Sequence, residues 1–205
     1  MRTPVQLAGG FACIPKLLSP TFAILVTVIK KAIIFHGTDG RPDVCWYPWL
    51  QRQLEARGIP TEVPYYPDIN KTPITDFLPR VLANHQFDDQ TVLIGHSGGA
   101  ALLLSILEHI EATVPQTILV AGYMTQPNHE AEPVLQDSYD WAKIRKHASD
   151  IYFINSINDP YGCNDRQGRA MFDKLGGTLI IKDEGHFGSA DQDYSSFPLL
   201  ERLII

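Results

Sequence analysis

The sequence contains few cysteines and no cluster of basic residues, and both shortages exclude classes of function. Its three cysteines, Cys13, Cys45 and Cys163, lie far apart and show no metal-ligand spacing, so a reduced, cytoplasmic setting is expected. Lysine and arginine form no block, and 23 acidic residues outnumber 17 basic ones, which gives a formal net charge of −6. Nucleic acid is therefore not an expected partner.

The N-terminal segment contains an apolar run, residues 22–29, that is too short to cross a bilayer. We therefore expect no stable membrane insertion. As a secretory signal, the segment has Lys16 within its apolar part, Lys30 and Lys31 on the wrong side, and no clear small-residue cleavage site. Residues 1–30 are interpreted as an N-terminal extension with three alternative roles. It is an extra strand or helix of the domain, a signal or anchor, or a segment that precedes the true start of the protein.

The remaining chain has the pattern of an α/β protein. Of the 205 residues, 44% are hydrophobic, which is enough for one well-filled core. From Lys31 onwards, short apolar runs alternate with longer amphipathic stretches, which favours βαβ units. We expect residues 31–205 to form a single α/β domain, with a mostly parallel central sheet and helices on both faces. The expected strands are 32–35, 61–66, 91–94, 117–121, 151–155 and 178–182, and the expected helices are 46–57, 74–85, 100–110, 139–147 and about 194–203.

The most informative stretch is residues 95–99, Gly-His-Ser-Gly-Gly, between an apolar strand and an apolar helix. It fits G-x-S-x-G, the nucleophile elbow, in which a serine sits on a strained turn between a strand and a helix. Glycines two before and two after the serine remove side chains that would collide there. Ser97 is therefore the candidate nucleophile. The backbone N–H of Gly98, at the start of the helix, is a candidate oxyanion donor.

The candidate acid and base each follow a later strand. Asp159 lies in a turn fixed by Pro160; it is either a triad acid or an Asx turn or N-cap for the next helix. His186 lies in a glycine-bracketed loop after the last strand, and the rival acid Asp183 is three residues before it. Ser97, Asp159 and His186 follow the chain order of the α/β-hydrolase triad. Because each follows a different strand, we expect them to converge at one edge of the sheet.

Other residues near this edge have less direct assignments. His36 belongs to the turn 36–40, where Thr38 or Asp39 is expected to supply a second oxyanion N–H, unless this is an ordinary βα turn. The side chain of His96 is expected to point away from the reacting face of Ser97. Trp46 and Trp49 share a helix face and are interpreted as packing residues. Residues 123–137 form either a small cap or a surface loop.

These residue types predict covalent catalysis. A serine hydroxyl is a weak nucleophile at neutral pH, so an imidazole must take its proton and later return one to the leaving group. Asp159 would orient His186, and backbone N–H groups would stabilise the oxyanion. No metal or cofactor is needed. We expect a carboxylesterase-like serine hydrolase that cleaves a small ester or amide through an acyl-enzyme; the alternatives are a non-catalytic ligand- or partner-binding protein and an acyltransferase.

The combination of motifs resembles the small serine-hydrolase family of retinoblastoma-binding protein 9 and its bacterial relatives. The resemblance runs from about residue 31 to the C-terminus and includes the aromatic segment 46–50, the elbow 95–99, the turn 158–160 and the loop 185–186. It implies a compact α/β-hydrolase with little or no cap. The family's triad falls on Ser97, Asp159 and His186. Residues 1–30 have no counterpart, the His-Gly start of the first turn departs from the family's common glycine-rich forms, and the L-x-C-x-E segment is absent, so no retinoblastoma partner is implied.

Overall fold

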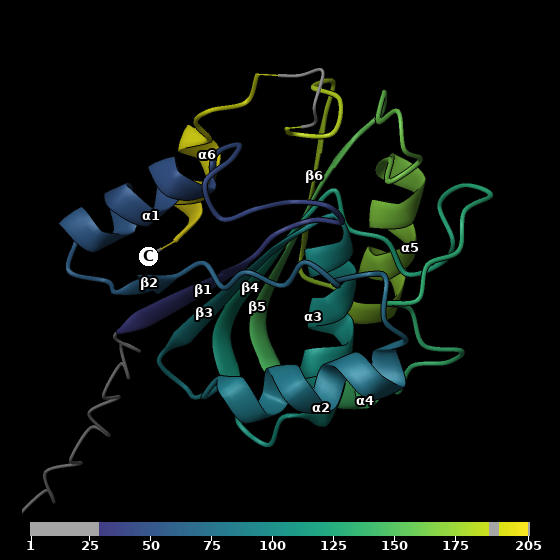
Figure 1. Ribbon diagram of the computed structural model, residues 1–205, viewed down its shortest axis with the longest axis horizontal. Coiled ribbons are helices and arrows are strands. Elements are labelled where there is room, and N and C mark those ends of the chain that lie inside the picture. The colour runs from purple at the N-terminus through teal and green to yellow at the C-terminus, as the bar shows by residue number, and fades with distance from the viewer. Residues whose placement is uncertain (1–28, 189–192, 205) are drawn as a thin grey trace, which may run out of the picture.

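The computed structural model describes residues 29–188 and 193–204, which form a six-stranded sheet covered by helices (Figure 1). All neighbouring strands are parallel. In spatial order the strands are β2 (Thr61–Glu62), β1 (Lys31–Phe35), β3 (Thr91–His96), β4 (Val114–Val120), β5 (Ala148–Ser156) and β6 (Thr178–Lys182). The expected α/β fold is confirmed.

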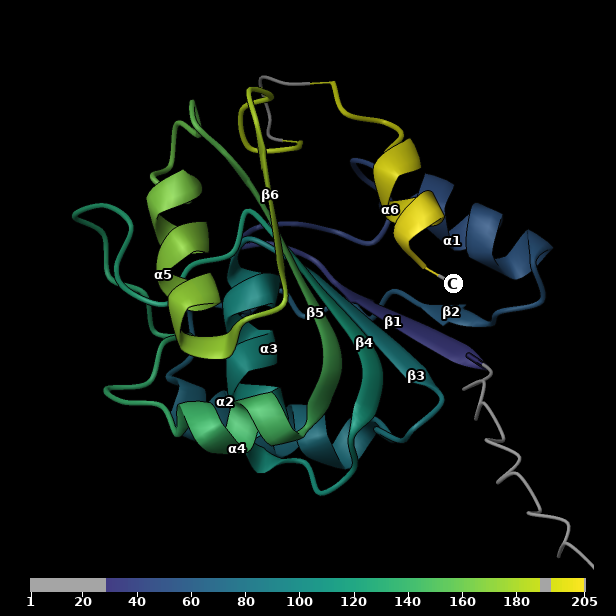
Figure 2. The ribbon, with the colours of Figure 1, turned by 180° about the vertical axis from the view of Figure 1, so that it is seen from behind.

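Helices lie on both faces of the sheet (Figures 1 and 2). One face carries α1 (Tyr47–Ala56) and α6 (Pro198–Leu203), and the other carries α2 (Ile74–Asn84), α3 (Gly98–His109), α4 (Trp141–Lys146) and α5 (Asp165–Leu175). Strands that are covered on both faces consist of nearly continuous apolar runs. Every residue of β3 is buried, which explains why its sequence shows no polar alternation.

The strand order places the candidate residues at one crevice. The chain proceeds from β1 to β2 in one direction and returns to β3 on the other side of β1. Open α/β sheets bind ligands at the carboxyl ends of the strands where the order reverses in this way. Phe35 at the end of β1 pairs with Gly95 near the end of β3. The turn 36–40 and the elbow at Ser97 therefore leave the sheet side by side.

Some expected elements differ in extent. The strand expected over 61–66 is limited to Thr61–Glu62 at the sheet edge, because Pro64 cannot donate to a strand ladder. The last helix begins at Pro198 instead of about residue 194. The sequence indicates helix α5 without bounds, only as a helix that Asp159 could cap; the N-cap residue is Asn164 instead. No helix among the described residues is long and apolar enough to cross a membrane. The expectations for residues 1–28, including Cys13, lie outside the described residues.

Candidate active site

Ser97 lies on a sharp turn between β3 and α3. Its backbone has a φ of 53° and a ψ of −120°, and α3 begins at the next residue. A positive φ is costly for a residue with a side chain and persists only where the surroundings enforce it. One such constraint is the backbone N–H of Ser97, which donates to the carbonyl of Val120 at 2.9 Å. The local geometry is the strand, strained turn and helix that the motif predicts.

The glycines of this turn are required by close backbone approach. A Cβ on Gly99 would lie 2.3 Å from the carbonyl oxygen of Phe35 and 2.5 Å from that of His36. A Cβ on Gly95 would lie 2.6 Å from the carbonyl oxygen of Gly99. These distances are too short for any real side chain, and the opposing atoms are backbone atoms that cannot rotate away. The elbow therefore packs directly on β1 and its following turn.

His186 and Asp159 form a buried hydrogen-bonded pair. Nδ1 of His186 lies 2.7 Å from Oδ2 of Asp159, and the Asp159 side chain is fully buried. Oδ1 of Asp159 accepts a hydrogen bond from the backbone N–H of Tyr161 at 2.8 Å. Asp159 thus forms an Asx-type turn and also contacts His186. The rival acid Asp183 is exposed to solvent.

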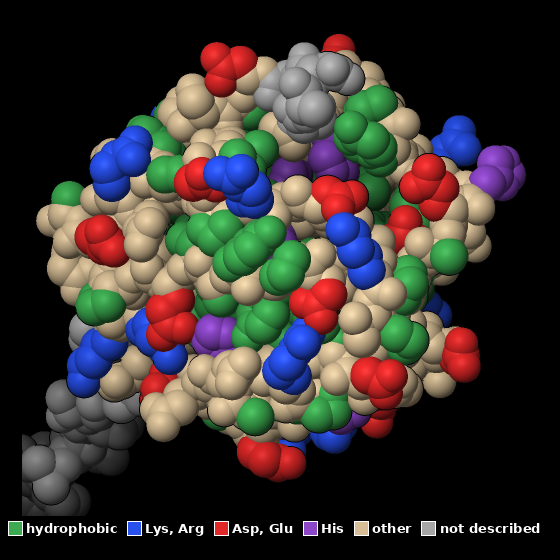
Figure 3. Space-filling view, in the orientation of Figure 1, with side chains coloured by type: hydrophobic (Ala, Val, Ile, Leu, Met, Phe, Trp, Pro, Cys, Tyr) green, Lys and Arg blue, Asp and Glu red, His purple; other side chains and the backbone are tan. Residues whose placement is uncertain are grey.

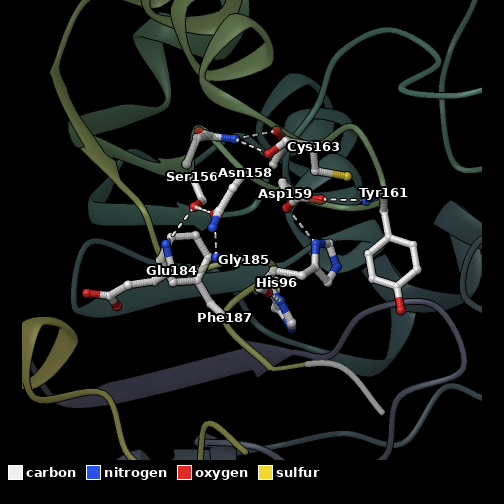
Figure 4. Close-up of polar contacts among 12 residues, drawn as sticks. His96, Ser156, Asn158, Asp159, Tyr161, Cys163, Glu184, Gly185 and Phe187 are labelled. Carbon is white, nitrogen blue, oxygen red and sulfur yellow. Dashed lines mark hydrogen bonds and ion pairs between the residues drawn. The ribbon is translucent and has the colours of Figure 1, made fainter. Parts of the chain in front are cut away.

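The loops that carry this pair are tied to each other (Figure 4). Oδ1 of Asn158 accepts hydrogen bonds from the Ser156 hydroxyl at 2.6 Å and from the backbone N–H of Gly185 at 2.7 Å. The Ser156 oxygen accepts a further hydrogen bond from the N–H of Glu184 at 2.8 Å. The end of β5 and the loop after β6 are therefore held in a fixed relationship immediately beside Asp159 and His186.

His96 is buried beside His186. Its ring centroid lies 4.9 Å from that of His186. Nδ1 of His96 is 2.6 Å from the Tyr47 hydroxyl, and Nε2 is 2.7 Å from the carbonyl oxygen of His186. Burial, with a further contribution from the nearby His186, lowers the pKa of His96 to about 3. Both ring nitrogens are engaged, so His96 is neutral at physiological pH and is not available as a base.

The turn after β1 faces the start of α3. A Cβ on Gly98 would lie 2.8 Å from Oγ1 of Thr38 and 3.4 Å from its backbone nitrogen. Nδ2 of Asn70 donates to Oγ1 of Thr38 at 3.1 Å and to Glu132 at 2.7 Å. The side chain of the neighbouring residue, Asp39, forms an ion pair with Lys71. The N–H groups of Gly98 and Thr38 thus belong to two backbone segments that meet above the elbow.

His36 has a structural role in the same turn. Its Nδ1 donates to the carbonyl of Gly37 at 2.7 Å, and its Nε2 accepts from the backbone N–H of Tyr66 at 3.0 Å. Burial lowers its pKa. Because both nitrogens bond to backbone groups, His36 fixes the turn and the adjoining segment in place.

A cavity of about 830 Å³ opens at this edge of the sheet. Ser97, His186 and Cys163 line it, together with Thr38 from the first turn. Figure 3 shows histidine side chains deep in a hollow on this face, with apolar and acidic side chains beside it. No helix or strand lies between β4 and α4, and the loop residues 127–128 and 130–132 form part of the cavity wall. The segment expected to be a cap or a loop is a loop that borders the cavity.

Cys163 is a buried thiol that the sequence did not single out. Burial and the nearby charge of Asp159 raise its pKa, and a hydrogen bond with the Ser97 side chain opposes this shift. Within the described residues, no hydrogen bond joins the Ser97 hydroxyl to His186. The ligand atoms of Asp159, Cys163 and His186 lie within 4.8 Å of one another, a spacing that could hold a metal ion. Two of these groups, the side chains of Asp159 and His186, are already joined by a hydrogen bond.

Trp46 lies in the core, as expected. It is fully buried, and its indole N–H donates to the carbonyl of Phe187 at 3.0 Å. Trp49 is partly buried and packs against the core. The contacts of Tyr47 and Cys163 carry no local sequence signal, because each depends on a partner from a distant segment, and the bond between Asn158 and Gly185 also joins distant segments. Only Asn158 could have been suspected, from its place beside Asp159 in the turn 158–160.

Comparison with known proteins finds one matching family and relatives that are named as hydrolases. The serine hydrolase family matches residues 32–204. YdeN from Bacillus subtilis (strain 168) is 26% identical over 180 residues, which cover 83% of this chain and 92% of YdeN. Serine hydrolase RBBP9 from Rattus norvegicus is 28% identical over 169 residues, which cover 78% of this chain and 89% of RBBP9.

Solved structures with a similar fold include one of these relatives. The crystal structure of YdeN matches with a TM-score of 0.77 at 26% identity, and the match covers 85% of this chain and 96% of YdeN. Est1E from Butyrivibrio proteoclasticus shares the fold, with a TM-score of 0.61 at 14% identity over 87% of this chain and 86% of Est1E. Because the family match extends from β1 to α6, this chain belongs to the serine hydrolase family and is an enzyme of that type.

Proposed function

We propose that this enzyme hydrolyses small carboxylic esters or amides through an acyl-enzyme formed on Ser97. The observation that carries the proposal is the arrangement of three side chains from three strand ends. Ser97 has a strained, positive φ and borders the same cavity as His186. His186 is bonded to the buried carboxylate of Asp159. These are the parts that nucleophilic serine catalysis requires.

His186 is assigned as the general base. Both oxygens of Asp159 accept hydrogen bonds, one from Nδ1 of His186 and one from the N–H of Tyr161. A neutral His186 that donates from Nδ1 has its lone pair on Nε2, which is the form that takes a proton from an attacking hydroxyl. The hydrogen bond between Ser97 and His186 would form as substrate enters, since catalytic hydrogen bonds are often long without substrate.

In the proposed reaction, Oγ of Ser97 attacks the substrate carbonyl carbon while Nε2 of His186 takes the hydroxyl proton. The carbonyl oxygen becomes an oxyanion that the N–H groups of Gly98 and Thr38 stabilise. His186 then protonates the leaving alcohol or amine as its bond to the carbonyl carbon breaks. A water molecule attacks the resulting ester of Ser97 by the same route, which releases the acid and restores the serine.

The cavity supports a small-molecule substrate. Its volume of about 830 Å³ falls in the usual range for sites that bind small organic ligands. Exposed Val44 and Tyr161 contribute apolar surface to its wall, together with the half-buried Cys45. Acidic side chains also line the cavity, among them Glu130 and Glu132. A substrate that carries no negative charge and has a partly apolar acyl or leaving group fits this lining.

Ester turnover by the purified protein tests the proposal. Fluorogenic esters with short and long acyl chains are compared for the native protein and Ser97→Ala, with folding checked by circular dichroism. We expect turnover by the native protein and a loss of about a thousandfold or more in the variant. A covalent acyl adduct on the peptide that contains Ser97, trapped at low pH, would identify the intermediate. Undiminished turnover by a folded Ser97→Ala would contradict the proposal.

A competing acceptor separates hydrolysis from acyl transfer. Added alcohols or amines would divert little of the acyl group if water is the natural acceptor, and the free acid would remain the main product. If the transfer product dominates at low acceptor concentration, the enzyme is an acyltransferase that uses the same nucleophile.

A further inference from the structure

We propose that Tyr47 and His96 are positioning residues that hold the backbone of the catalytic-histidine loop and thereby aim His186 at Ser97. The inference rests on the proposed function, because it assumes that His186 is the general base. The proposal gives a positioning role to two buried side chains that neither bond to Asp159 nor take part in proton transfer.

The two side chains form a chain of hydrogen bonds whose direction is fixed at both ends. The backbone N–H of Gly37 donates to the Tyr47 hydroxyl oxygen at 3.3 Å. At the other end, the carbonyl of His186 can only accept, so Nε2 of His96 is the protonated nitrogen in the 2.7 Å bond. Nδ1 of His96 must then accept the proton of the Tyr47 hydroxyl, 2.6 Å away. One tautomer of His96 satisfies all three bonds.

This chain joins three separate parts of the site. Gly37 belongs to the turn after β1, His96 is the residue before Ser97, and His186 is in the loop after β6. Tyr47 is 1% exposed and His96 is 2% exposed, so water does not compete for their hydrogen bonds. Burial also keeps both groups neutral, since it lowers the pKa of His96 and raises that of Tyr47. The connection therefore persists over the whole physiological pH range.

The histidine loop has a backbone that needs such support. Gly185, Phe187 and Gly188 all have positive φ values, of 61°, 55° and 115°. Phe187 is fully buried and, unlike glycine, pays a steric cost for that conformation. A strained backbone persists only where its surroundings determine it. Two side chains supply that constraint, because the carbonyl of His186 accepts from His96 and the carbonyl of Phe187 accepts from Trp46.

Adjacent residues of one segment thus secure successive carbonyls of the loop. Trp46 bonds the loop directly, whereas Tyr47 acts through His96. A shift of the His186 carbonyl would turn its ring relative to Ser97, and proton transfer is sensitive to small displacements of this kind. Loss of the connection should therefore reduce kcat more than it changes KM.

The experiment compares Tyr47→Phe, His96→Phe and His96→Gln with the native enzyme. A fluorophosphonate probe counts the competent sites in each preparation, so that kcat is expressed per labelled site and unfolded protein does not contribute. Tyr139→Phe is the matched control, because it removes a partly buried tyrosine hydroxyl that bonds to the backbone N–H of Gln136 and to the side chain of Ser105, none of which lines the cavity. A purely structural role would lower the number of sites without changing kcat per site.

We expect kcat per site to fall about 10- to 100-fold in His96→Phe and by a smaller factor in Tyr47→Phe, with KM changed less. In His96→Gln, the side-chain amide can again donate to the carbonyl of His186, so part of the lost kcat should return. Native kcat per site in His96→Phe, or equal losses in the Phe and Gln variants, would overturn the inference. A folded native enzyme that turns over ester but leaves Ser97 unlabelled would instead contradict the proposed function.

Discussion

The Nδ1 atom of His186 and the Oδ2 atom of Asp159 lie 2.7 Å apart, although 27 positions separate the two residues in the chain. They meet because β5 and β6 are neighbours and parallel, so both strands deliver their following loops to the same edge. Asn158 reinforces the arrangement by accepting a hydrogen bond from the backbone of Gly185. The pairing of Asp159 with His186 is therefore a consequence of the strand order in the sheet and of the turn that contains Asn158.

Asp159→Asn should nearly abolish turnover without unfolding the protein. An asparagine oxygen can still accept from the N–H of Tyr161, but its amide cannot stabilise a charged His186 and favours the wrong tautomer. We expect kcat to fall by about 10³ to 10⁴, with a small change in KM. Asp183→Asn is the matched control, since it changes an exposed carboxylate three residues before His186. Similar kcat values for the two variants would contradict the assignment of Asp159.

Gly99→Ala should destabilise the fold more than Gly58→Ala does. A Cβ on Gly99 would approach the carbonyl oxygen of Phe35 to 2.3 Å, whereas a Cβ on Gly58 would meet nothing within 4 Å. Gly58 has a φ of 78°, so its substitution costs conformational strain alone, about 1 kcal/mol. We expect the free energy of unfolding, measured in urea, to fall by about 3 kcal/mol or more for Gly99→Ala. Equal losses would show that backbone approach is not what requires Gly99.

Gly98→Ala tests the two backbone segments assigned to the oxyanion. The added Cβ would lie 2.8 Å from Oγ1 of Thr38, which would push the turn 36–40 away from the start of α3. We expect kcat to fall about 10-fold or more, because oxyanion donors must be correctly placed. In a Thr38→Ala background the clashing oxygen is absent, so the same substitution should cost less. Additive losses in the double variant, measured by steady-state kinetics, would argue against this contact.

The stability of the protein should decrease in acid partly because of His96. Burial lowers the pKa of His96 from 6.5 to about 3, so between these values the unfolded chain binds a proton that the folded protein does not. The contribution of His96 to the free energy of unfolding therefore falls by about 1.4 kcal/mol per pH unit as the pH drops below 6.5. It levels off near pH 3. His36, whose pKa is also lowered, acts in the same direction.

Urea unfolding at several acidic pH values measures this slope. His96→Gln removes the titrating group, so its free energy of unfolding should depend less steeply on pH, by up to one proton. Tyr139→Phe, which removes no histidine, should retain the native slope. Parallel curves for the native protein and His96→Gln would show that His96 does not contribute to acid destabilisation.

The fold class could be predicted from the sequence because short runs of apolar residues indicate the strands. The apolar runs that became β1, β3, β5 and β6 were recognisable, and parallel strands present their carboxyl ends at one edge. Ser97, Asp159 and His186 each follow such a run, so their convergence follows from the topology. The strained elbow was also predictable, because the glycines around Ser97 indicate close backbone contact.

Contacts between distant side chains could not be predicted in this way. Tyr47 and His96 are 49 positions apart, and their hydrogen bond depends on how α1 packs beside β3. The bounds of helix α5 could not be predicted because its sequence is mostly polar, with a glycine in the middle. That glycine, Gly168, allows close approach to β5, where an added Cβ would lie 2.4 Å from Oδ1 of Asn155. Tertiary packing decides such features, and a single sequence does not contain it.

The most direct test of the central claim is covalent labelling of the native protein with a fluorophosphonate probe, followed by peptide mass spectrometry. The probe reacts with an activated serine, so the account predicts a single modified peptide that carries the adduct on Ser97. Labelling should be lost in Ser97→Ala and His186→Ala, both shown to be folded. A folded native protein that remains unlabelled, or that is labelled equally in His186→Ala, would contradict the assignment of Ser97 as a nucleophile activated by His186.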